Sequence, residues 1–381
     1  MCIELEKKNK EWVDSVWERL DKKLSVATVK NRDIIPYTSN DGKYDDRGKA
    51  NVAWWSNGFW GGMMWLMYQG TGNEEYKKTA LRSEEILDGA LENFKVLDHD
   101  AGFMWHLVSG ANYRMNGDIK SCNRNLHAAA SLASRFNIDG KFIRAWNADG
   151  YEGWSIIDCM MNLPLLYWAS EEIGDPRFKR IAMCHADMCL KHHIREDGSV
   201  NHIVVHDTET GEMIESKGGQ GYGVGSCWSR GLAWAIYGMA LSYRYTKKEE
   251  YLKAAIKCAN YFAANVASTD YKTPVDFRAP REPMYYDSSA GVCSACGLLE
   301  IAKYVSDAEA YMYTDTAIKV LKATDECFCD YDVERDSVVR MATERYPLDG
   351  VMRWVHVNLT YADFFFVEAI LKLKDKEYCI W

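Results

Sequence analysis

A recurring turn between two kinds of helix constrains the fold of this chain more than any other feature of its sequence. The pattern consists of a helix end, a polar turn, and then an acidic or small residue followed by an aromatic residue. It occurs at residues 71–76, 173–178, 246–251 and 305–311, and a looser copy lies at 137–142. Each copy is typical of a tight turn followed by the N-cap of the next helix. Pro176 fits this interpretation, because proline is tolerated in the first turn of a helix.

The helices on the two sides of each turn differ in character. Those before the turn are apolar and aromatic nearly all round, as in residues 162–169 and 232–243, whereas those after it are amphipathic, as in residues 74–91 and 249–264. A wholly apolar helix is buried, and an amphipathic helix covers it. Repeated inner-and-outer hairpins, about six in 381 residues, predict one all-α domain, residues 1–381, closed into an (α/α)6 toroid. An open helical-repeat scaffold that binds proteins is the alternative.

Long loops rich in glycine and aromatic residues precede the expected inner helices or turns. They lie at residues 98–114, 145–155, 200–225, 271–288 and 340–357, and residues 199–206 within this set alternate like a strand. In a toroid, the loops that enter the inner helices meet at one end of the ring. We therefore expect the functional site at that end.

Charge and composition narrow the possible functions. The net charge of −9 is spread over many segments and no basic stripe is visible, which excludes a nucleic-acid partner. No stretch of 18 apolar residues is present, so no membrane-spanning helix is predicted. The first seven residues lack the apolar core of a signal peptide, and 12 cysteines are scattered through helix-like segments, so we expect reduced thiols and a cytoplasmic location. The 13% aromatic content suits clefts for sugar rings.

Two carboxylates are candidates for catalysis. Asp158 stands at the start of an otherwise apolar helix, where burial would raise its pKa as a general acid near neutral pH requires. Asp100 precedes Gly102 in a loop. Taken singly, Asp158 is equally well explained as an N-cap, and Asp100 is better explained as an Asx-turn. Together, two loop carboxylates that face an aromatic cleft are the usual minimum for glycosidic chemistry.

Further side chains complete the candidate cleft. A tryptophan at a helix entrance offers a platform for a sugar face, and we assign Trp55 rather than Trp60 to this position. Arg230 and Trp234 lie four residues apart and share one helix face, where the guanidinium would hold a carboxylate and the indole would stack. A structural ion pair with a buried aspartate is the alternative for Arg230. His202, considered alone, is typical of a surface histidine.

Two tempting patterns are discounted. Cys293 and Cys296 form a CxxC inside an apolar run with no second pair at zinc spacing, so no metal site is predicted. His185, His192 and His193 are expected on the solvated face of an outer helix. The sequence also contains no P-loop and no dinucleotide fingerprint.

Taken together, these sequence motifs resemble those of the unsaturated glucuronyl hydrolases of glycoside hydrolase family 88. The resemblance rests on five stretches in order, at residues 55–60, 99–103, 156–158 with 161–166, 220–221 with 226–234, and 287–290. Asn162-Leu163-Pro164 after Asp158 resembles this family more than its relatives that act on unsaturated rhamnogalacturonan.

The resemblance implies a six-hairpin α/α toroid that uses no metal and no organic cofactor. It implies as binding partner an oligosaccharide left by polysaccharide lyases, with a C4=C5 double bond in its terminal uronate. Asp158 would be the general acid/base and Asp100 the second essential carboxylate. The implied substrate-binding set is Trp55, His202, Ser216, Gly218, Gln220, Arg230 and Trp234.

The implied chemistry is hydration rather than direct displacement. A neutral Asp158 would protonate C4 of the vinyl ether, and the resulting carboxylate would activate water to add at C5. Asp100 would raise the pKa of Asp158 by like-charge repulsion and hold ring hydroxyls. The hemiketal that forms then opens and releases the aglycone.

Several points stay open at this stage. The loop at 215–220 lacks the bulkier residue expected before Gln220, and residues 350–355 differ from the stretches of sulfate-reading members. The aglycone, the linkage, the sulfation preference and the choice between a monomer and a weak homo-oligomer are therefore undecided. Alternatives on the same fold are an unsaturated rhamnogalacturonyl hydrolase and an inverting glycosidase. A non-catalytic carbohydrate-binding or scaffold protein is the alternative from another class.

Overall fold

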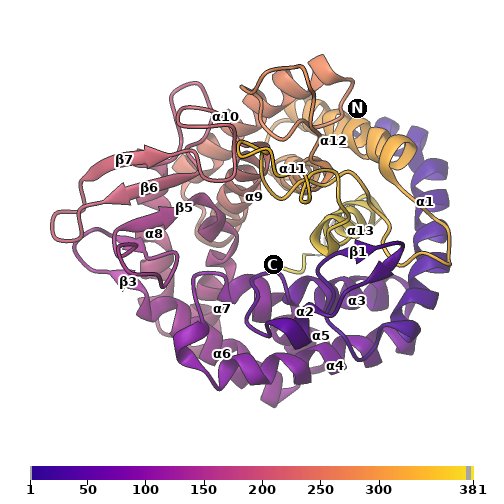
Figure 1. Ribbon diagram of the computed structural model, residues 1–381, viewed down its shortest axis with the longest axis horizontal. Helices are drawn as coiled ribbons and strands as arrows, with labels where there is room; N and C mark the ends of the chain where they lie inside the picture. Colours follow the sequence, from indigo (N-terminus) through magenta and orange to yellow (C-terminus); the bar gives the residue numbers. More distant parts are fainter. Residues whose placement is uncertain (1, 375–378) are drawn as a thin grey trace.

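The computed structural model shows a ring of helices in two layers (Figure 1). It describes residues 2–374 and 379–381, so Met1 and residues 375–378 of the expected domain lie outside the described residues. The inner layer contains α3 (Gly58–Thr71), η2 (Gly102–Gly110) with α5 (Ala111–Asn116), α7 (Leu163–Ile173), α9 (Ser229–Thr246), α11 (Ser288–Ile301) and α13 (Thr360–Lys374). The outer layer contains α1 (Cys2–Lys30), α4 (Glu74–Leu91), α6 (Ile119–Ser134), α8 (Arg177–His192), α10 (Glu249–Val266) and α12 (Asp307–Phe328).

Contacts between the inner helices close the ring. In order round the centre, α3 packs on η2, η2 on α7, α7 on α9, α9 on α11, α11 on α13, and α13 back on α3. Each inner element also packs on its outer partner, and the last pair joins α13 to α1, from opposite ends of the chain. These inner–outer pairs confirm the predicted (α/α)6 toroid.

The turns between paired helices follow the expected pattern. α3 and α7 end at Gly72 and Gly174, whose φ of 71° and 66° glycine adopts without steric strain. Asn73 then caps α4 by accepting a backbone N–H two residues on. Ser306 and Glu309 form a capping box at the start of α12. Local turn chemistry therefore accounts for the repeated change of direction between the two layers.

Two of the expected segments differ from the structure. The looser copy of the turn at 137–142 is a small hairpin of β3 (Phe136–Asn137) and β4 (Phe142–Ile143), not a junction between helices. The segment at 98–114, expected as a loop, is mostly the π-helical η2 and part of α5. Gly102 allows η2 to start against α7, because a Cβ there would lie 2.6 Å from the Cα of Asn162.

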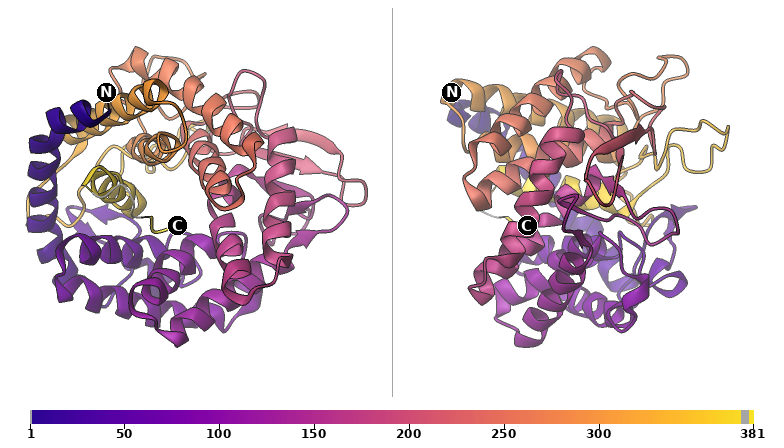
Figure 2. Two further views of the ribbon diagram at one scale, coloured as in Figure 1. Left: turned by 180° about the vertical axis from the view of Figure 1, so that it is seen from behind. Right: turned by 90° about the vertical axis from the view of Figure 1, so that its left-hand side faces the viewer.

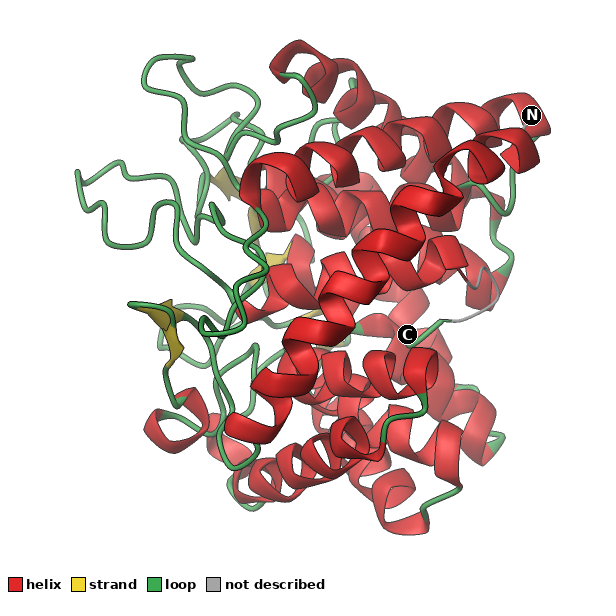
Figure 3. Ribbon diagram, turned by 90° about the vertical axis from the view of Figure 1, so that its right-hand side faces the viewer, coloured by secondary structure: helices red, strands yellow, loops and turns green. Residues whose placement is uncertain are grey.

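The remaining elements are short and lie in the connections. The strands β5 (Trp154–Ile156), β6 (Ile203–His206) and β7 (Met213–Lys217) form an antiparallel sheet in that order, which confirms the strand-like pattern at 199–206. The others are β1 (Ser39–Asn40), β2 (Lys43–Tyr44), α2 (Arg47–Ala50), η1 (Phe94–Val96), η3 (Ile157–Met161) and η4 (Ala267–Thr269). Most of the longer loops extend from one face of the ring (Figures 2 and 3).

The inner helices are surrounded by protein on all sides. Every residue of α11 is buried, including Cys293 and Cys296, and Trp60 and Trp65 of α3 are fully buried. Although these helices are apolar, none in the described part of the chain is long and apolar enough to cross a membrane.

The histidines of α8 are less exposed than expected. His185 and His193 are fully buried, so their expected place on a solvated face is wrong. His185 Nδ1 accepts the backbone N–H of Ile143, and His193 Nε2 lies 2.9 Å from the Ser155 hydroxyl. These bonds attach the outer helix to the small strands, which is why the imidazole rings of His185 and His193 point inward.

Candidate active site

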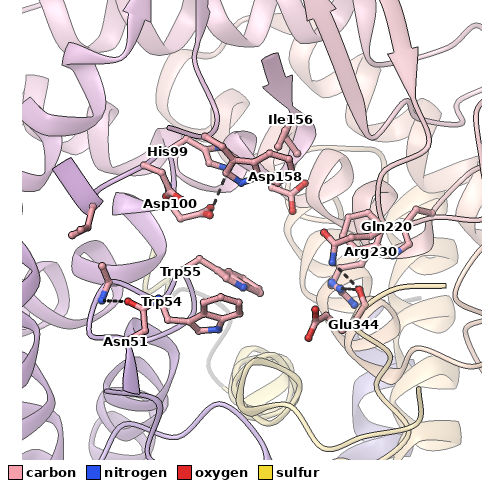
Figure 4. Close-up of a pocket in the computed structure, with 15 residues that line it drawn as sticks. Asn51, Trp54, Trp55, His99, Asp100, Ile156, Asp158, Gln220, Arg230 and Glu344 are labelled. Atoms are coloured by element: carbon pink, nitrogen blue, oxygen red, sulfur yellow. Dashed lines mark hydrogen bonds and ion pairs between the residues drawn. The ribbon is translucent and has the colours of Figure 1, made fainter. Parts of the chain in front are cut away.

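A cavity of about 480 Å³ opens among these loops (Figure 4). Its walls come from the segments that precede α3, η2, α7, α9 and α13, so five of the hairpins contribute to it. The residues that line it are Asn51, Ala53, Trp54, Trp55, Val96, Asp98, His99, Asp100, Trp146, Ile156, Asp158, Gln220, Trp228, Arg230 and Glu344.

Five of the nine site residues expected from the sequence line this cavity. They are Trp55, Asp100, Asp158, Gln220 and Arg230. Figure 4 shows the two aspartates along one side, with Trp54 and Trp55 below them and Arg230 and Gln220 opposite. The order of the motifs along the chain thus places residues from distant segments in one pocket.

Four of the expected residues, His202 among them, are not part of the cavity wall in the described part of the chain. Trp234 is fully buried and packs against Phe103 and Phe365, with ring centroids 5.3 and 5.6 Å away. The structure therefore places Trp234 in the core beneath the cavity and not on a surface where a sugar would stack. Ser216 lies in β7, paired with β6, and Gly218 follows that strand.

Asp158 lies in η3, directly after β5, and its side chain is 17% exposed. It does not cap a helix, because Ile156 and Asn162 occupy the N-cap positions of η3 and α7. Burial alone would raise the pKa of Asp158, but the nearby ring of His202, helped by His99 and Arg230, lowers this pKa below its ordinary value. The expectation that burial keeps Asp158 protonated is therefore wrong for the ligand-free protein.

His202 is held with one ring nitrogen facing Asp158. The backbone N–H of Gln220 donates to Nδ1 at 3.0 Å, so a neutral ring carries its proton on Nε2. Nε2 lies 3.3 Å from Oδ1 of Asp158, and neither atom has a hydrogen-bond partner in the described chain. At 5% exposure, His202 is not the surface histidine that its sequence context indicated.

Gly219 explains the small residue before Gln220. Its φ is 58°, and a Cβ at this position would lie 2.0 Å from Nδ1 of His202. A bulkier residue in this segment would push the backbone off the imidazole and remove the bond that selects its tautomer. The departure from the expected loop sequence is therefore a condition for placing His202.

Asp100 occupies a drier position than Asp158. It is 6% exposed; its Oδ1 accepts a hydrogen bond from Asn162 at 3.1 Å, and its Oδ2 lies 3.5 Å from Nε2 of His99. Burial raises the pKa of Asp100 well above its ordinary value, and the charges of Asp98 and Asp158 raise it further against the opposing hydrogen bond from Asn162. Of the two carboxyl groups, Asp100 is therefore the weaker acid and Asp158 the stronger.

The raised pKa of Asp100 predicts a pH-dependent stability difference. An unfolded chain releases the Asp100 proton near the ordinary aspartate pKa, whereas the folded chain keeps it to higher pH. The stabilisation from this group is thus complete at low pH and is lost as the pH rises through the raised pKa, by at most about 1.4 kcal/mol per pH unit. Melting temperatures should therefore fall with rising pH in the parent relative to Asp100→Asn, whose amide cannot ionise.

The exposed Asp149 offers a control for this comparison. The melting temperature of Asp149→Asn should follow that of the parent at every pH, because the substitution removes a carboxylate that is solvated in both the folded and the unfolded chain. A constant difference in melting temperature between the parent and Asp100→Asn across the pH range would show that folding does not raise the pKa of Asp100.

Arg230 forms the structural ion pair that was one interpretation of its sequence, and it also borders the cavity. Its Nη1 donates to Asp287 and to the carbonyl oxygen of Thr343, and its Nη2 donates to the carbonyl oxygen of Glu344 at 2.6 Å. The side chain is only 1% exposed, yet it borders the cavity. The structural ion pair is therefore present, and the guanidinium also places a buried positive charge beside the pocket.

Aromatic side chains form much of the remaining wall. Trp55 is held by Phe103 and Tyr361, with ring centroids 5.6 and 5.0 Å away, and Trp60 is buried in the core. Trp54, Trp146 and Trp228 also line the cavity, although sequence reasoning did not assign them there. Trp146 could have been found, since it lies in one of the long aromatic loops. Glu344 carried no comparable signal in its loop.

The arrangement suits proton transfer to a flat, singly charged ligand. The pKa of one carboxyl group is raised and that of the second is lowered in the same partly dry pocket, which is the usual pattern of acid–base pairs. Tryptophan faces offer stacking area for a ring, and Arg230 offers positive potential for an anionic group.

Comparisons with known proteins agree with this arrangement. A family model described as Glycosyl Hydrolase Family 88 matches residues 29–268. The unsaturated glucuronyl hydrolase of Bacillus sp. (strain GL1) is 37% identical over 328 residues, which cover 84% of this chain and 86% of the relative. A crystal structure of the unsaturated glucuronyl hydrolase from Bacillus sp. GL1, described as responsible for the degradation of glycosaminoglycan, matches with a TM-score of 0.87 and 33% identity over 94% of this chain and 97% of that one.

A second solved structure is similar as well. It is a variant of the unsaturated glucuronyl hydrolase from Streptococcus agalactiae complexed with dGlcA-GalNAc6S, and it matches with a TM-score of 0.80 and 26% identity. The match covers 97% of this chain and 93% of that one. The similarity thus extends over nearly the whole ring.

Proposed function

Because the chain belongs to glycoside hydrolase family 88, we propose that it removes the terminal 4,5-unsaturated uronic acid from oligosaccharides that lyases leave from glycosaminoglycans. The observation that carries this proposal is the pair of carboxyl groups, Asp100 with a raised pKa and Asp158 with a lowered pKa, in a pocket walled by tryptophans. The protein is accordingly a glycoside hydrolase whose reaction is a hydration of the C4=C5 double bond.

Asp158 is the group we assign to proton transfer. It gives a proton to C4, which leaves positive charge at C5 shared with the ring oxygen. As a carboxylate it then accepts a proton from the water that adds to C5. The ring oxygen leaves C5 as the new hydroxyl becomes a ketone, and the hemiacetal left at C1 releases the aglycone.

The ionised state of Asp158 in the free protein requires one further step. The substrate brings its own carboxylate into the pocket and displaces water, and both changes raise the pKa of Asp158. Asp158 therefore takes up a proton as the substrate binds. Nε2 of His202 faces this carboxylate, 3.3 Å from its Oδ1.

Asp100 supports the same reaction from its protonated state. A neutral carboxylic acid donates a hydrogen bond to a ring hydroxyl without repelling the substrate carboxylate. Asn162 fixes its orientation and also donates to the backbone oxygen of Asp158, so one amide connects the two acids. We assign Trp55, Gln220 and Arg230 to substrate binding on the basis of their places in the wall.

Purified protein should consume the vinyl ether of unsaturated disaccharides from chondroitin, hyaluronan or heparin. Hydration of the double bond destroys its ultraviolet absorbance, so the loss of absorbance measures turnover directly. We expect kcat/KM in the ordinary enzyme range of about 10⁴ M⁻¹s⁻¹ or more on at least one of these substrates. The matched saturated disaccharides should not be hydrolysed.

Other outcomes of this assay favour other functions. Turnover confined to unsaturated rhamnogalacturonan fragments would indicate the related hydrolase, and hydrolysis of saturated substrates would indicate an inverting glycosidase. Binding without any turnover would indicate a carbohydrate-binding protein.

We place the enzyme in the cytoplasm. The support is its cysteine chemistry: the eleven cysteines whose side chains the structure describes are all free thiols, and most are buried. Free thiols in this number are typical of a reducing compartment, where structural disulfides do not persist.

A further inference from the structure

We propose that Arg135 is a positioning residue for the hydration reaction. It fastens the segment that carries Asp100 to the segment that carries Trp146, and it places a positive charge behind the acidic side of the cavity. The inference rests on the proposed function and adds a residue to it. Arg135 is the C-cap residue of the outer helix α6, and it does not belong to the cavity wall among the described residues. It therefore acts on the reaction through the side chains that do line the cavity.

The guanidinium of Arg135 joins two loops. Its Nη1 donates to the carbonyl oxygen of Leu97 at 3.1 Å and to Oδ1 of Asn147 at 2.7 Å. Its Nη2 donates to the carbonyl oxygen of Ala145 at 2.9 Å, and its Nε donates to that of Arg144 at 2.9 Å. One rigid, planar group thus holds four acceptors in a fixed arrangement, which a flexible ammonium group cannot do.

Both loops carry side chains that line the cavity. Residues 98–100 directly follow the first acceptor, and Trp146 lies between the others. The carbonyl oxygen of Ala145 also accepts the backbone N–H of His99 at 3.3 Å. The N–H of Ala145 donates to the carbonyl oxygen of Trp154 at 2.9 Å, and Trp154 begins β5, directly before η3. Arg135 therefore supports a junction at which three parts of the cavity wall meet.

The charge of Arg135 acts on the acidic side of the cavity. All four of its acceptors are neutral, and a guanidinium stays charged at any pH that a protein tolerates. Burial lowers the pKa of Arg135, as does the charge of Arg144, whereas Asp98, Cys159 and Asp100 oppose this shift. The interaction is mutual: burial and the charge of Asp98 raise the pKa of Asp100, and the charge of Arg135 limits that rise.

The test measures kcat/KM on an unsaturated disaccharide against pH for the parent, Arg135→Lys and Arg135→Met. Lysine keeps the charge but cannot hold four acceptors, so kcat/KM at the optimum pH should fall about 10–100-fold in both variants. Because the reaction needs neutral Asp100, activity falls as the pH rises through its pKa. Removing the positive charge raises this pKa further, so the alkaline limb of the profile should move to higher pH in Arg135→Met and stay in place in Arg135→Lys.

Arg195 offers a matched control. Its guanidinium also donates to four neutral acceptors on two loops, which belong to Ser199, Val200, Asn201 and Ser226. These loops carry neither Asp100 nor Trp146. Arg195→Met should therefore lower the melting temperature and leave the alkaline limb at the parental pH. An equal displacement of the limb in Arg195→Met would show that loosened loops, and not the charge of Arg135, move it.

Melting temperatures report on the charge without turnover. The stability that the parent gains over Asp100→Asn is lost as the pH rises, and with Arg135→Met in both proteins this loss should begin at a higher pH. If Arg135→Met does not fold, Arg135→Gln replaces it as the neutral variant.

Two results would overturn the proposal. Parental kcat/KM in Arg135→Lys would show that the four hydrogen bonds do not position the site. An alkaline limb and a melting difference that both stay at the parental pH in the neutral variant would show that the charge does not act on Asp100. If the parent consumes no unsaturated disaccharide, the proposed function fails, while the melting temperatures still decide whether Arg135 acts on Asp100.

Discussion

Asp158→Asn should turn over unsaturated disaccharides at least about 10³-fold more slowly than the parent while still binding them. The amide can neither give a proton to C4 nor accept one from water, whereas its size matches the carboxylate. Absorbance loss measures the turnover, and calorimetry measures the binding. Calorimetry in buffers of different ionisation enthalpy should also detect proton uptake on binding in the parent and none in the variant, because Asp158 is ionised in the free protein.

Asp98→Asn is the matched control for this experiment. Asp98 lines the same cavity, and its Oδ1 accepts the backbone N–H of Asp100, a bond that asparagine retains. Turnover by Asp98→Asn should be lower than that of the parent by less than about tenfold. If Asp158→Asn kept turnover within tenfold of the parent, another group would have to be the acid.

Asp287→Ala should lower the free energy of unfolding by about 3–5 kcal/mol. Asp287 is fully buried and accepts from Arg230, from the hydroxyl and backbone N–H of Ser289 and from the backbone N–H of Thr343. Its removal leaves a guanidinium that is 1% exposed without its ionic partner. Thermal unfolding followed by circular dichroism should show a melting temperature lower by about 4–6 °C.

Asp14→Ala tests whether burial is the cause of the large loss of stability that we expect for Asp287→Ala. Asp14 also pairs with cations, Lys10 and Lys374, but its side chain is 34% exposed. Solvent screens such pairs, so this variant should lose no more than about 1 kcal/mol. Equal losses in the two variants would mean that the Arg230–Asp287 pair stabilises the ring no more than a surface pair does.

The hairpin architecture was predictable because its signals are local. Gly174 before Asp175-Pro176, and Ser306 with Glu309, specify a helix end or a helix start within a few residues. The π-helical η2 was not predictable in the same way. Gly102 and Gly110 interrupt its helical pattern, and the helix forms because neighbouring elements approach it closely.

The candidate site was predictable in position but less so in electrostatics. The sequence order of Trp55, Asp100, Asp158 and Arg230 was sufficient to place them in one pocket. The pKa of Asp158 depends on His202, 44 positions later in the chain, and on a tautomer that the Gln220 backbone selects. No local pattern encodes such a contact. The same holds for Glu344, which is remote from every motif in the chain.

The closure of the ring by α1 and α13 has a consequence for how the enzyme can change. Each wall of the pocket arrives on a different hairpin, so the site is complete only when five of the six hairpins are assembled. The loop that carries Glu344 is nevertheless independent of the segments that carry Asp100 and Asp158. A loop exchanged between homologues would change one wall of the pocket and leave the segments that carry Asp100 and Asp158 as they are.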